Sequence, residues 1–290
     1  MSENSTSFYK NKEISCGDQL LKLDEPKIMG IINLTNDSFF DGGKYNTGEK
    51  YLFKAAEMIE AGAHIIDVGA ASTRPGAKLI KEKEEWEILQ KPLQSLKRNF
   101  PNVLISVDTY NSNQVKKCAH LGVNIINDIS GGSWDDRMFQ EVSQYTMAYV
   151  LMHIQGQPDN MQESPKYHSV VKDLIHYFKS KIEEFKELNF HQIILDPGFG
   201  FGKTTRHNYE LLAKLSQFAN LKYPILAGLS RKSMIFKVLK NSPAESLNGT
   251  SVLNAFALQN GAQILRVHDV KQAYETIALF LQYKEGYHQN

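Results

Sequence analysis

The sequence has too few cysteines for a disulfide framework. Its 290 residues include only two, Cys16 and Cys118, and these lie far apart in the chain. A thiol metal site needs closely spaced cysteine pairs, so this pattern argues against such a site as well. The fold must therefore depend on a hydrophobic core, and the 42% of apolar residues suffice to build one.

Long apolar runs and an excess of charge are also missing. No run approaches the roughly 20 residues of a membrane span, and residues 1–12 lack the apolar region of a secretory signal. With 33 basic and 32 acidic side chains, the net charge of +1 creates no strong field for nucleic acid or anionic lipid. We expect a cytoplasmic protein without membrane or nucleic-acid partners, in which local groups hold any anionic ligand.

Several catalytic motifs are absent. The chain has no Ser–His–Asp spacing, no H-E-x-x-H and no cysteine in a nucleophile context, and its nine histidines do not cluster at zinc-ligand spacing. Gly202–Lys203–Thr204 looks like the end of a P-loop, but Pro197 stands where that motif needs its first glycine. These absences argue against a nucleophilic hydrolase, a zinc enzyme and a P-loop protein.

What the chain does contain is a repeated alternation of apolar, β-branched runs with helical stretches. Continuous apolar runs are typical of parallel strands buried on both faces. Eight such units at this length predict an α/β protein whose residues 1–290 form a single (β/α)8 TIM barrel domain. An open doubly wound sheet is the alternative, but the glycine fingerprint expected after its first strand is missing. The expected strands are residues 28–32, 64–68, 103–107, 124–129, 147–152, 192–195, 224–229 and 263–267, and the expected helices include 49–61, 82–97, 114–121, 170–188, 209–218 and 251–259.

An N-terminal extension, residues 1–26, precedes the first of these strands. Within it, residues 14–21 read as a hairpin that turns at Gly17–Asp18. We expect this hairpin to cover the bottom of the barrel.

Polar or ionisable groups follow nearly every expected strand. Any one of them could simply cap a helix or a turn, but active sites of such barrels lie at the C-terminal strand ends. The repetition therefore predicts an active site. The residues concerned are Asn33, Asp67, Asp108, Asn127–Asp128, His153, Asp196, Ser230–Lys232 and Arg266–Asp269.

Two chemical faces can be distinguished within this set. Arg231, Lys232, Arg266 and His268 follow the last two strands, where such barrels commonly bind phosphate, and so predict an anionic leaving group. Asp108, Asn127 and Asp196 supply acceptors that suit a flat heterocycle with N–H donors.

Two loops at the barrel mouth complete the expected site. The first carries Asp37 and Asp41 among glycines and suits a lid; the second carries Arg74, which could bind phosphate or carboxylate oxygens. Asn33 and the lid carboxylates offer only oxygen ligands, which favour Mg²⁺.

The chain resembles the dihydropteroate synthase family over nearly its whole length. The matching segments follow the strands in order, and several are specific to that family. They are MGIINLTNDSFFDGG (29–43), DVGAASTRPGA (67–77), SVDTY (106–110), INDISG (126–131), LMHIQG (151–156), DPGFGFGK (196–203), GLSRKS (228–233) and RVHDV (266–270).

The resemblance implies a reaction in which a dihydropterin pyrophosphate loses pyrophosphate and 4-aminobenzoate attacks the exposed methylene carbon. It also implies Mg²⁺ as cofactor, with Asn33 as its ligand on the pyrophosphate side, and a homodimer. The implied pterin residues are Asp108, Asn127, Met152, Asp196 and Lys232; Arg266 and His268 would anchor pyrophosphate; Thr73, Pro75, Phe201 and Ser230 would line the aminobenzoate side; and Asp37, Asp41, Arg74 and Lys232 would contribute to catalysis.

Two other functions fit parts of this pattern. A pterin-binding methyltransferase-type module would share the barrel and the pterin pocket, but it should lack the Arg266–His268 pair and the aspartate lid. An inactive paralogue used as a binding protein is disfavoured because every matching position is intact, although the sequence leaves it open.

Overall fold

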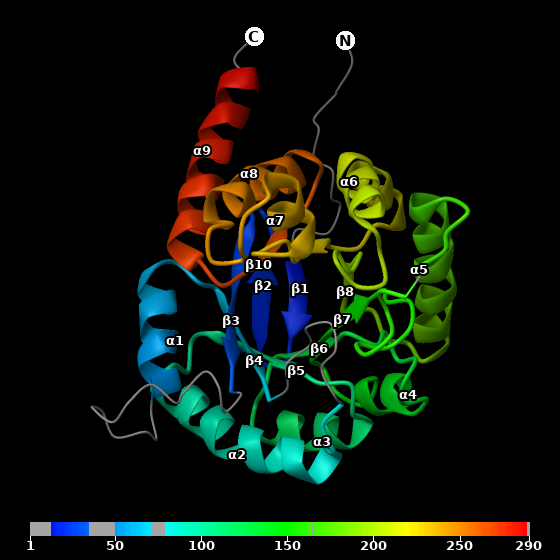
Figure 1. Cartoon of the computed structure of the whole chain (residues 1–290). Coiled ribbons are helices and arrows are strands. Elements are labelled where there is room, and N and C mark those ends of the chain that lie inside the picture. The colour runs from blue at the N-terminus through cyan, green and yellow to red at the C-terminus, as the bar shows by residue number, and fades with distance from the viewer. Residues whose placement is uncertain (1–12, 35–49, 71–78, 164, 289–290) are drawn as a thin grey trace, which may run out of the picture.

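The computed structural model describes residues 13–34, 50–70, 79–163 and 165–288. Its centre is a sheet of eight parallel strands in the order β8-β7-β6-β5-β4-β3-β10-β9, surrounded by helices (Figure 1). The strands are β3 (Lys27–Asn33), β4 (Ile65–Gly69), β5 (Leu104–Asp108), β6 (Ile125–Asp128), β7 (Ala148–Met152), β8 (Ile193–Asp196), β9 (Leu226–Ala227) and β10 (Ile264–Val267). Each overlaps a strand predicted from the sequence, and the predicted barrel is confirmed.

The barrel is nearly closed. Between β8 and β9 the pairing shrinks to an isolated parallel bridge, Leu195 to Ile225. There the amide of Leu195 donates to the carbonyl of Pro224 at 2.8 Å. This seam is the thinnest pairing around the barrel.

All six helices expected from periodicity are present, with one change. The helix predicted over residues 209–218 is two elements, because a capping box between Thr204 and His207 starts a helix earlier and this helix ends before Lys214. Three further helices were not predicted from the sequence: the short helices α4 and α7 and the long helix α9. The helical elements are α1 (Lys50–Glu60), α2 (Glu82–Asn99), α3 (Ser112–His120), α4 (Met138–Val142), α5 (Val170–Glu187), α6 (Thr205–Ala213), the 3₁₀ helix η2 (Leu215–Leu221), α7 (Ser233–Leu239), α8 (Leu247–Gln259) and α9 (Val270–His288). None of these helices in the described part of the chain is long and apolar enough to cross a bilayer.

The predicted hairpin is also confirmed. Strands β1 (Glu13–Cys16) and β2 (Gln19–Lys22) pair antiparallel around a turn at Gly17–Asp18. The amide of Gly17 donates to the carbonyl of Thr146 at 2.9 Å, and Asn124 Nδ2 donates to the carbonyl of Cys16 at 3.0 Å. Hairpin side chains and the N-terminal halves of the strands form one buried cluster, so the hairpin covers the bottom of the barrel.

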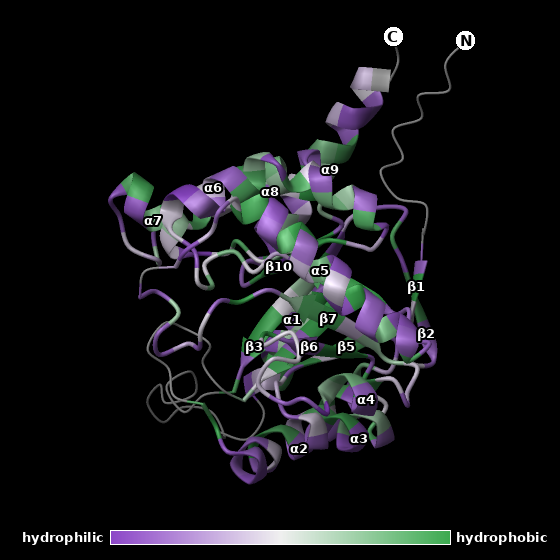
Figure 2. Cartoon of the chain, turned by 90° about the vertical axis from the view of Figure 1, so that its right-hand side faces the viewer, coloured by the Kyte–Doolittle hydropathy of each residue, from purple (hydrophilic) through white to green (hydrophobic). Residues whose placement is uncertain are grey.

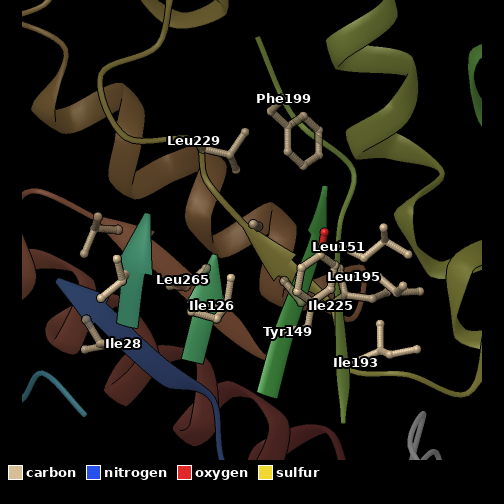
Figure 3. Packing of buried hydrophobic residues seen from close by; sticks show 14 of the residues in the cluster. Ile28, Ile126, Tyr149, Leu151, Ile193, Leu195, Phe199, Ile225, Leu229 and Leu265 are labelled. Atoms are coloured by element: carbon tan, nitrogen blue, oxygen red, sulfur yellow. The ribbon is translucent and has the colours of Figure 1, made fainter. Parts of the chain in front are cut away.

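Alternation along the strands separates two apolar layers and one polar layer. The hydropathy colouring of Figure 2 shows the central strands as largely hydrophobic. Outward side chains such as Ile28, Tyr149 and Leu265 pack between sheet and helices (Figure 3). Inward side chains are apolar at the bottom of the barrel. Two residues further along several strands, the inward positions become polar, as at Asp67 and Arg266. This change from apolar to polar inward side chains forms the polar site at the C-terminal strand ends.

Candidate active site

The structure describes ten of the residues predicted for the site, and all lie at C-terminal strand ends or in the loops that follow. They are Asn33, Asp108, Asn127, Met152, Asp196, Phe201, Ser230, Lys232, Arg266 and His268. The other predicted site residues, Asp37, Asp41, Thr73, Arg74 and Pro75, lie outside the described residues.

Arg266 is at the centre of the polar layer and joins two carboxylates. Its Nε donates to Asp67 Oδ2 at 2.7 Å, and its terminal nitrogen donates to Asp108 Oδ2 at 2.9 Å. Asn127 Nδ2 also donates to Asp67 Oδ2, at 3.0 Å. Register accounts for one part of this meeting, because Asp108 of β5 pairs with Asn127 of β6. The hydrogen bonds of Arg266 then bring the cation of one face together with a carboxylate acceptor of the other.

Asp67 was named from the sequence only as a strand-end residue, not as part of the site. It is fully buried, and its Oδ1 has no hydrogen-bond partner among the described residues. Its inward position in β4, two residues after the inward Ile65, was the signal that could have identified it.

The electrostatics of this layer are set by burial. Burial raises the pKa of Asp108 to about 7, and the charge of Arg266 opposes that shift. Burial also raises the pKa of Asp196, while Lys232 acts in the opposite sense. Burial lowers the pKa of Lys232 to about 8, although Asp196 favours its charged form. For Arg266, burial disfavours the charge, but Asp67 and Asp108 outweigh it and raise its pKa. Burial therefore moves the pKa values of Asp108 and Lys232 toward neutral pH.

Lys232 approaches this layer from the loop after β9. Its Nζ donates to the carbonyl of Phe199 and lies 4.5 Å from the centroid of the Phe201 ring. A methyl group added at Gly200 would lie 3.1 Å from the Lys232 side chain, so glycine permits this approach. Asp196 ends β8 and is followed by the glycine-rich loop, residues 197–203; its Oδ1 accepts from the amide of Gly198 at 2.7 Å. Through these contacts the glycine-rich loop brings Phe201 and Lys232 together at the end of β8.

Lys203, which gave the segment its likeness to a P-loop, is buried inside the protein. A P-loop presents amides to an anion, whereas here carbonyls converge on the ammonium of Lys203. Nζ donates to the carbonyls of His153, Gly198 and Phe201 at 3.2, 3.0 and 2.9 Å. The rejection of a P-loop from the sequence agrees with this geometry.

At the rim, the loops after β9 and β10 are hydrogen-bonded to each other. Ser230 Oγ lies 3.1 Å from Nδ1 of His268 and accepts from the His268 amide at 3.3 Å. Arg231 does not join the predicted group of four cations, because Asp269 binds its guanidinium in two places. The basic residues of this group that lie at the mouth are Lys232, Arg266 and His268.

Two strand-end residues serve the structure of the protein itself. Asp128 accepts from the hydroxyl of Tyr149 at 2.5 Å and from the amides of Ser130 and Gly132 at 2.7 and 2.8 Å. His153 lies 3.1 Å from the buried ammonium of Lys203 through its Nδ1. The capping and packing explanation is therefore the right one at these positions.

Within the described residues, no three His, Cys, Asp or Glu side chains gather in an arrangement that could hold a metal ion. Asn33 ends β3, is half-buried, lies in register with Gly69 of β4 and offers one amide oxygen. This donor fits a hard cation that takes most of its ligands from elsewhere, as Mg²⁺ does with substrate phosphates.

Comparison with known proteins gives the same assignment from sequence. A model of the pterin binding enzyme family matches residues 29–268. The dihydropteroate synthase of Escherichia coli K12 is 41% identical over 259 residues, which cover 89% of this chain and 91% of that protein. The dihydropteroate synthase of Haemophilus influenzae is 38% identical over 260 residues, covering 89% of this chain and 94% of that protein.

Solved structures agree over almost the whole chain. The dihydropteroate synthase of Yersinia pestis, solved with a sulfonamide drug complex, matches with a TM-score of 0.88 and 38% identity over 94% of this chain and 99% of that one. The enzyme of Xanthomonas albilineans, solved with 4-aminobenzoic acid, matches with a TM-score of 0.87 and 32% identity over 94% and 98% of the two chains. A barrel with this polar mouth and these relatives belongs to the dihydropteroate synthase family of pterin binding enzymes.

Proposed function

We propose that the polar mouth of the barrel is where this transferase moves the pterin group of 6-hydroxymethyl-7,8-dihydropterin pyrophosphate to 4-aminobenzoate. The observation that carries this proposal is the bridge from Arg266 to Asp67 and Asp108 at the level of Asn127. It puts buried acceptors and a permanent cation in one pocket, as a pterin that bears two phosphates requires.

The pterin ring binds in the deep part of this pocket. Asp108, Asn127 and Asp196 accept hydrogen bonds from its N–H donors, and Met152 supplies apolar contact. Asn127 directs its amide nitrogen to Asp67, which leaves the amide oxygen as the group offered to the ring. Lys232, beside Phe201, donates to the acceptor side of the ring.

The pyrophosphate lies toward the rim, with His268, Arg266 and Asn33. Two nitrogens of Arg266 are already bound by carboxylates, so we assign His268 a large share of the contact with phosphate. When Mg²⁺ is bound, held by Asn33 and phosphate oxygens, it neutralises negative charge on the leaving group. Asn33 is the one described residue that we assign to this ion.

The reaction needs no protein nucleophile. The bond between the pterin methylene carbon and oxygen breaks, its electron pair leaves with pyrophosphate, and positive charge builds on the methylene. The amine of 4-aminobenzoate then forms a carbon–nitrogen bond and loses a proton.

Phe201 and Ser230 hold this second substrate, and Thr73 and Pro75 complete its side of the site. Asp37, Asp41 and Arg74 close the mouth against water and stabilise the charges.

One assay tests this function. Purified protein receives the pterin pyrophosphate, 4-aminobenzoate and Mg²⁺, and dihydropteroate and pyrophosphate are measured together. Equal amounts of both products are expected, and omission of Mg²⁺ should lower the rate. An inactive paralogue would bind the pterin and release neither product, and this result would overturn the proposal. The cytoplasmic location stays a prediction.

We also propose a homodimer formed through α7, α8 and α9, which adjoin one another in Figure 1. These helices expose several large apolar side chains, which favours a partner surface. Phe256→Glu should give monomers in light scattering, while Phe53→Glu, at a similarly exposed site on α1, should not. The exposed residues are Val238, Leu239, Val252, Phe256, Tyr274, Leu279 and Tyr283.

A further inference from the structure

Arg231 lies between two proposed site residues, yet the proposed chemistry does not use it. Its backbone has φ 54°, a left-handed conformation that side chains other than glycine rarely adopt. Its guanidinium binds Asp269 in a forked arrangement, with Nε to Oδ2 and a terminal nitrogen to Oδ1, both at 2.9 Å. Such paired bonds fix orientation as well as distance.

The remaining donors of Arg231 bind two further segments. The other terminal nitrogen donates to the carbonyls of Pro243 and Ala244 at 3.0 and 2.6 Å, in the connection between α7 and α8. The backbone amide of Arg231 donates to Thr250 Oγ1 in α8 at 3.0 Å. Because these bonds act together, they can hold a backbone conformation that would otherwise be disfavoured.

Arg231 lies in the loop after β9, and Asp269 lies in the loop after β10. Arg231 directly follows Ser230, on the proposed aminobenzoate side, and Asp269 directly follows His268, on the proposed pyrophosphate side. Ser230 and His268 are themselves in contact, with Oγ 3.1 Å from Nδ1. The Arg231–Asp269 pair therefore braces this contact from outside the pocket.

We propose that Arg231 and Asp269 are positioning residues which set the spacing between the aminobenzoate side and the pyrophosphate side of the site. The inference rests on the function proposed above. A lysine at position 231 would keep the charge and lose the fork, and an asparagine at position 269 would keep the shape and lose the charge. Lys232 follows Arg231 directly, but its amino group is held by the carbonyl of Phe199, and Asn127 is held by Asp67, so the pterin residues should respond much less.

Calorimetry with two ligands tests this role in the full-length protein. Arg231→Lys and Asp269→Asn should each weaken binding of the pterin pyrophosphate by about tenfold or more, because the rim loops lose their alignment. Binding of 6-hydroxymethylpterin, which lacks phosphates, should change by less than about twofold. The double variant should be no worse than the poorer single variant, since both remove one interaction. Arg137→Lys is the matched control, because Arg137 pairs with Asp135 at an exposed site.

The outcomes separate this inference from the proposed function. If the wild-type protein binds both pterins equally and makes no dihydropteroate, the proposed function fails. If the wild-type protein is active but the two variants behave like Arg137→Lys, the positioning role is wrong. Equal weakening of both ligands, with a lower melting temperature, would make the pair a general stabiliser and would also overturn the inference.

Discussion

Lys203 and His153 contact each other inside the protein, with Nζ 3.1 Å from Nδ1. Burial lowers the pKa of His153 to about 2, and the charge of Lys203 acts in the same direction, so the imidazole is neutral. Burial also lowers the pKa of Lys203 to about 7. No described carboxylate is hydrogen-bonded to Lys203, and its amino group donates to backbone carbonyls instead. This arrangement fastens the glycine-rich loop to the end of β7.

Replacement of this lysine should therefore destabilise the protein. In Lys203→Met the side-chain volume is kept, but buried carbonyls lose their donor, and we expect the free energy of unfolding to fall by about 2–4 kcal/mol. Urea unfolding measures the change. Lys179→Met, at an exposed site on α5, is the control and should stay within about 0.5 kcal/mol of wild type. Equal stability of the two variants would show that the carbonyls need no cation.

Asp196→Asn should weaken pterin binding about 10- to 100-fold, because a charged acceptor opposite N–H donors becomes neutral. Calorimetric titration with 6-hydroxymethylpterin gives the affinity directly. Asp136→Asn, a surface change of the same kind, should leave the affinity as in wild type. An unchanged affinity in Asp196→Asn would remove this residue from the proposed pterin pocket.

Pterin affinity should depend on pH through Asp108, whose pKa burial raises to about 7. Below that value the unliganded site carries a proton on Asp108, and a ligand that needs the carboxylate must displace it. Affinity should then rise with pH, by up to about tenfold per unit below pH 7, and level off above it. Titrations between about pH 6 and 7.5, within reach of this pKa, test the slope. Asp108→Asn should bind weakly with a flatter profile; an affinity that rises on acidification would contradict the assignment.

Gly198→Ala should disrupt the glycine-rich loop. This glycine has φ 67°, and an added methyl group would lie 2.1 Å from the carbonyl oxygen of His153. The loop must shift, so both the melting temperature and dihydropteroate formation should fall. Gly286→Ala, in an open position near the end of α9, adds a methyl group that meets nothing within 4 Å and should leave both quantities intact. A fully active Gly198→Ala enzyme would mean that the loop tolerates another shape.

The periodicity of apolar residues and the composition of the turns predicted most of the fold. A continuous apolar run such as β7 is typical of a strand buried on both faces, and Gly17–Asp18 marks a turn by its chemistry. The division of residues 209–218 was missed because a side-chain cap at Thr204 decided where the helix began. The short pairing of β9 depends on closure of the barrel, which no local pattern encodes.

The site was predictable only in part, for a similar reason. Strand ends identified Asp108, Asn127 and Asp196, because active sites of such barrels lie at the C-terminal ends of the strands. The roles of Asp67 and Arg231 depend on which residues lie opposite them across the barrel or in another loop. Asp67 meets Arg266, 199 positions away, and Arg231 meets Asp269, 38 positions away. Alternation along β4 could have placed Asp67 on the inward face, but register and loop packing decide which residue it meets, and the local sequence does not encode them.

The thin seam between β8 and β9 has a consequence for ligand binding. Asp196 ends the strand on one side of the seam, and Lys232 belongs to the loop that leaves the strand on the other side. A pterin bound by both residues would connect β8 and β9 where few hydrogen bonds join them. Substrate binding should therefore stabilise this part of the barrel. Slower hydrogen exchange of the Leu195 amide in the presence of ligand would measure that effect.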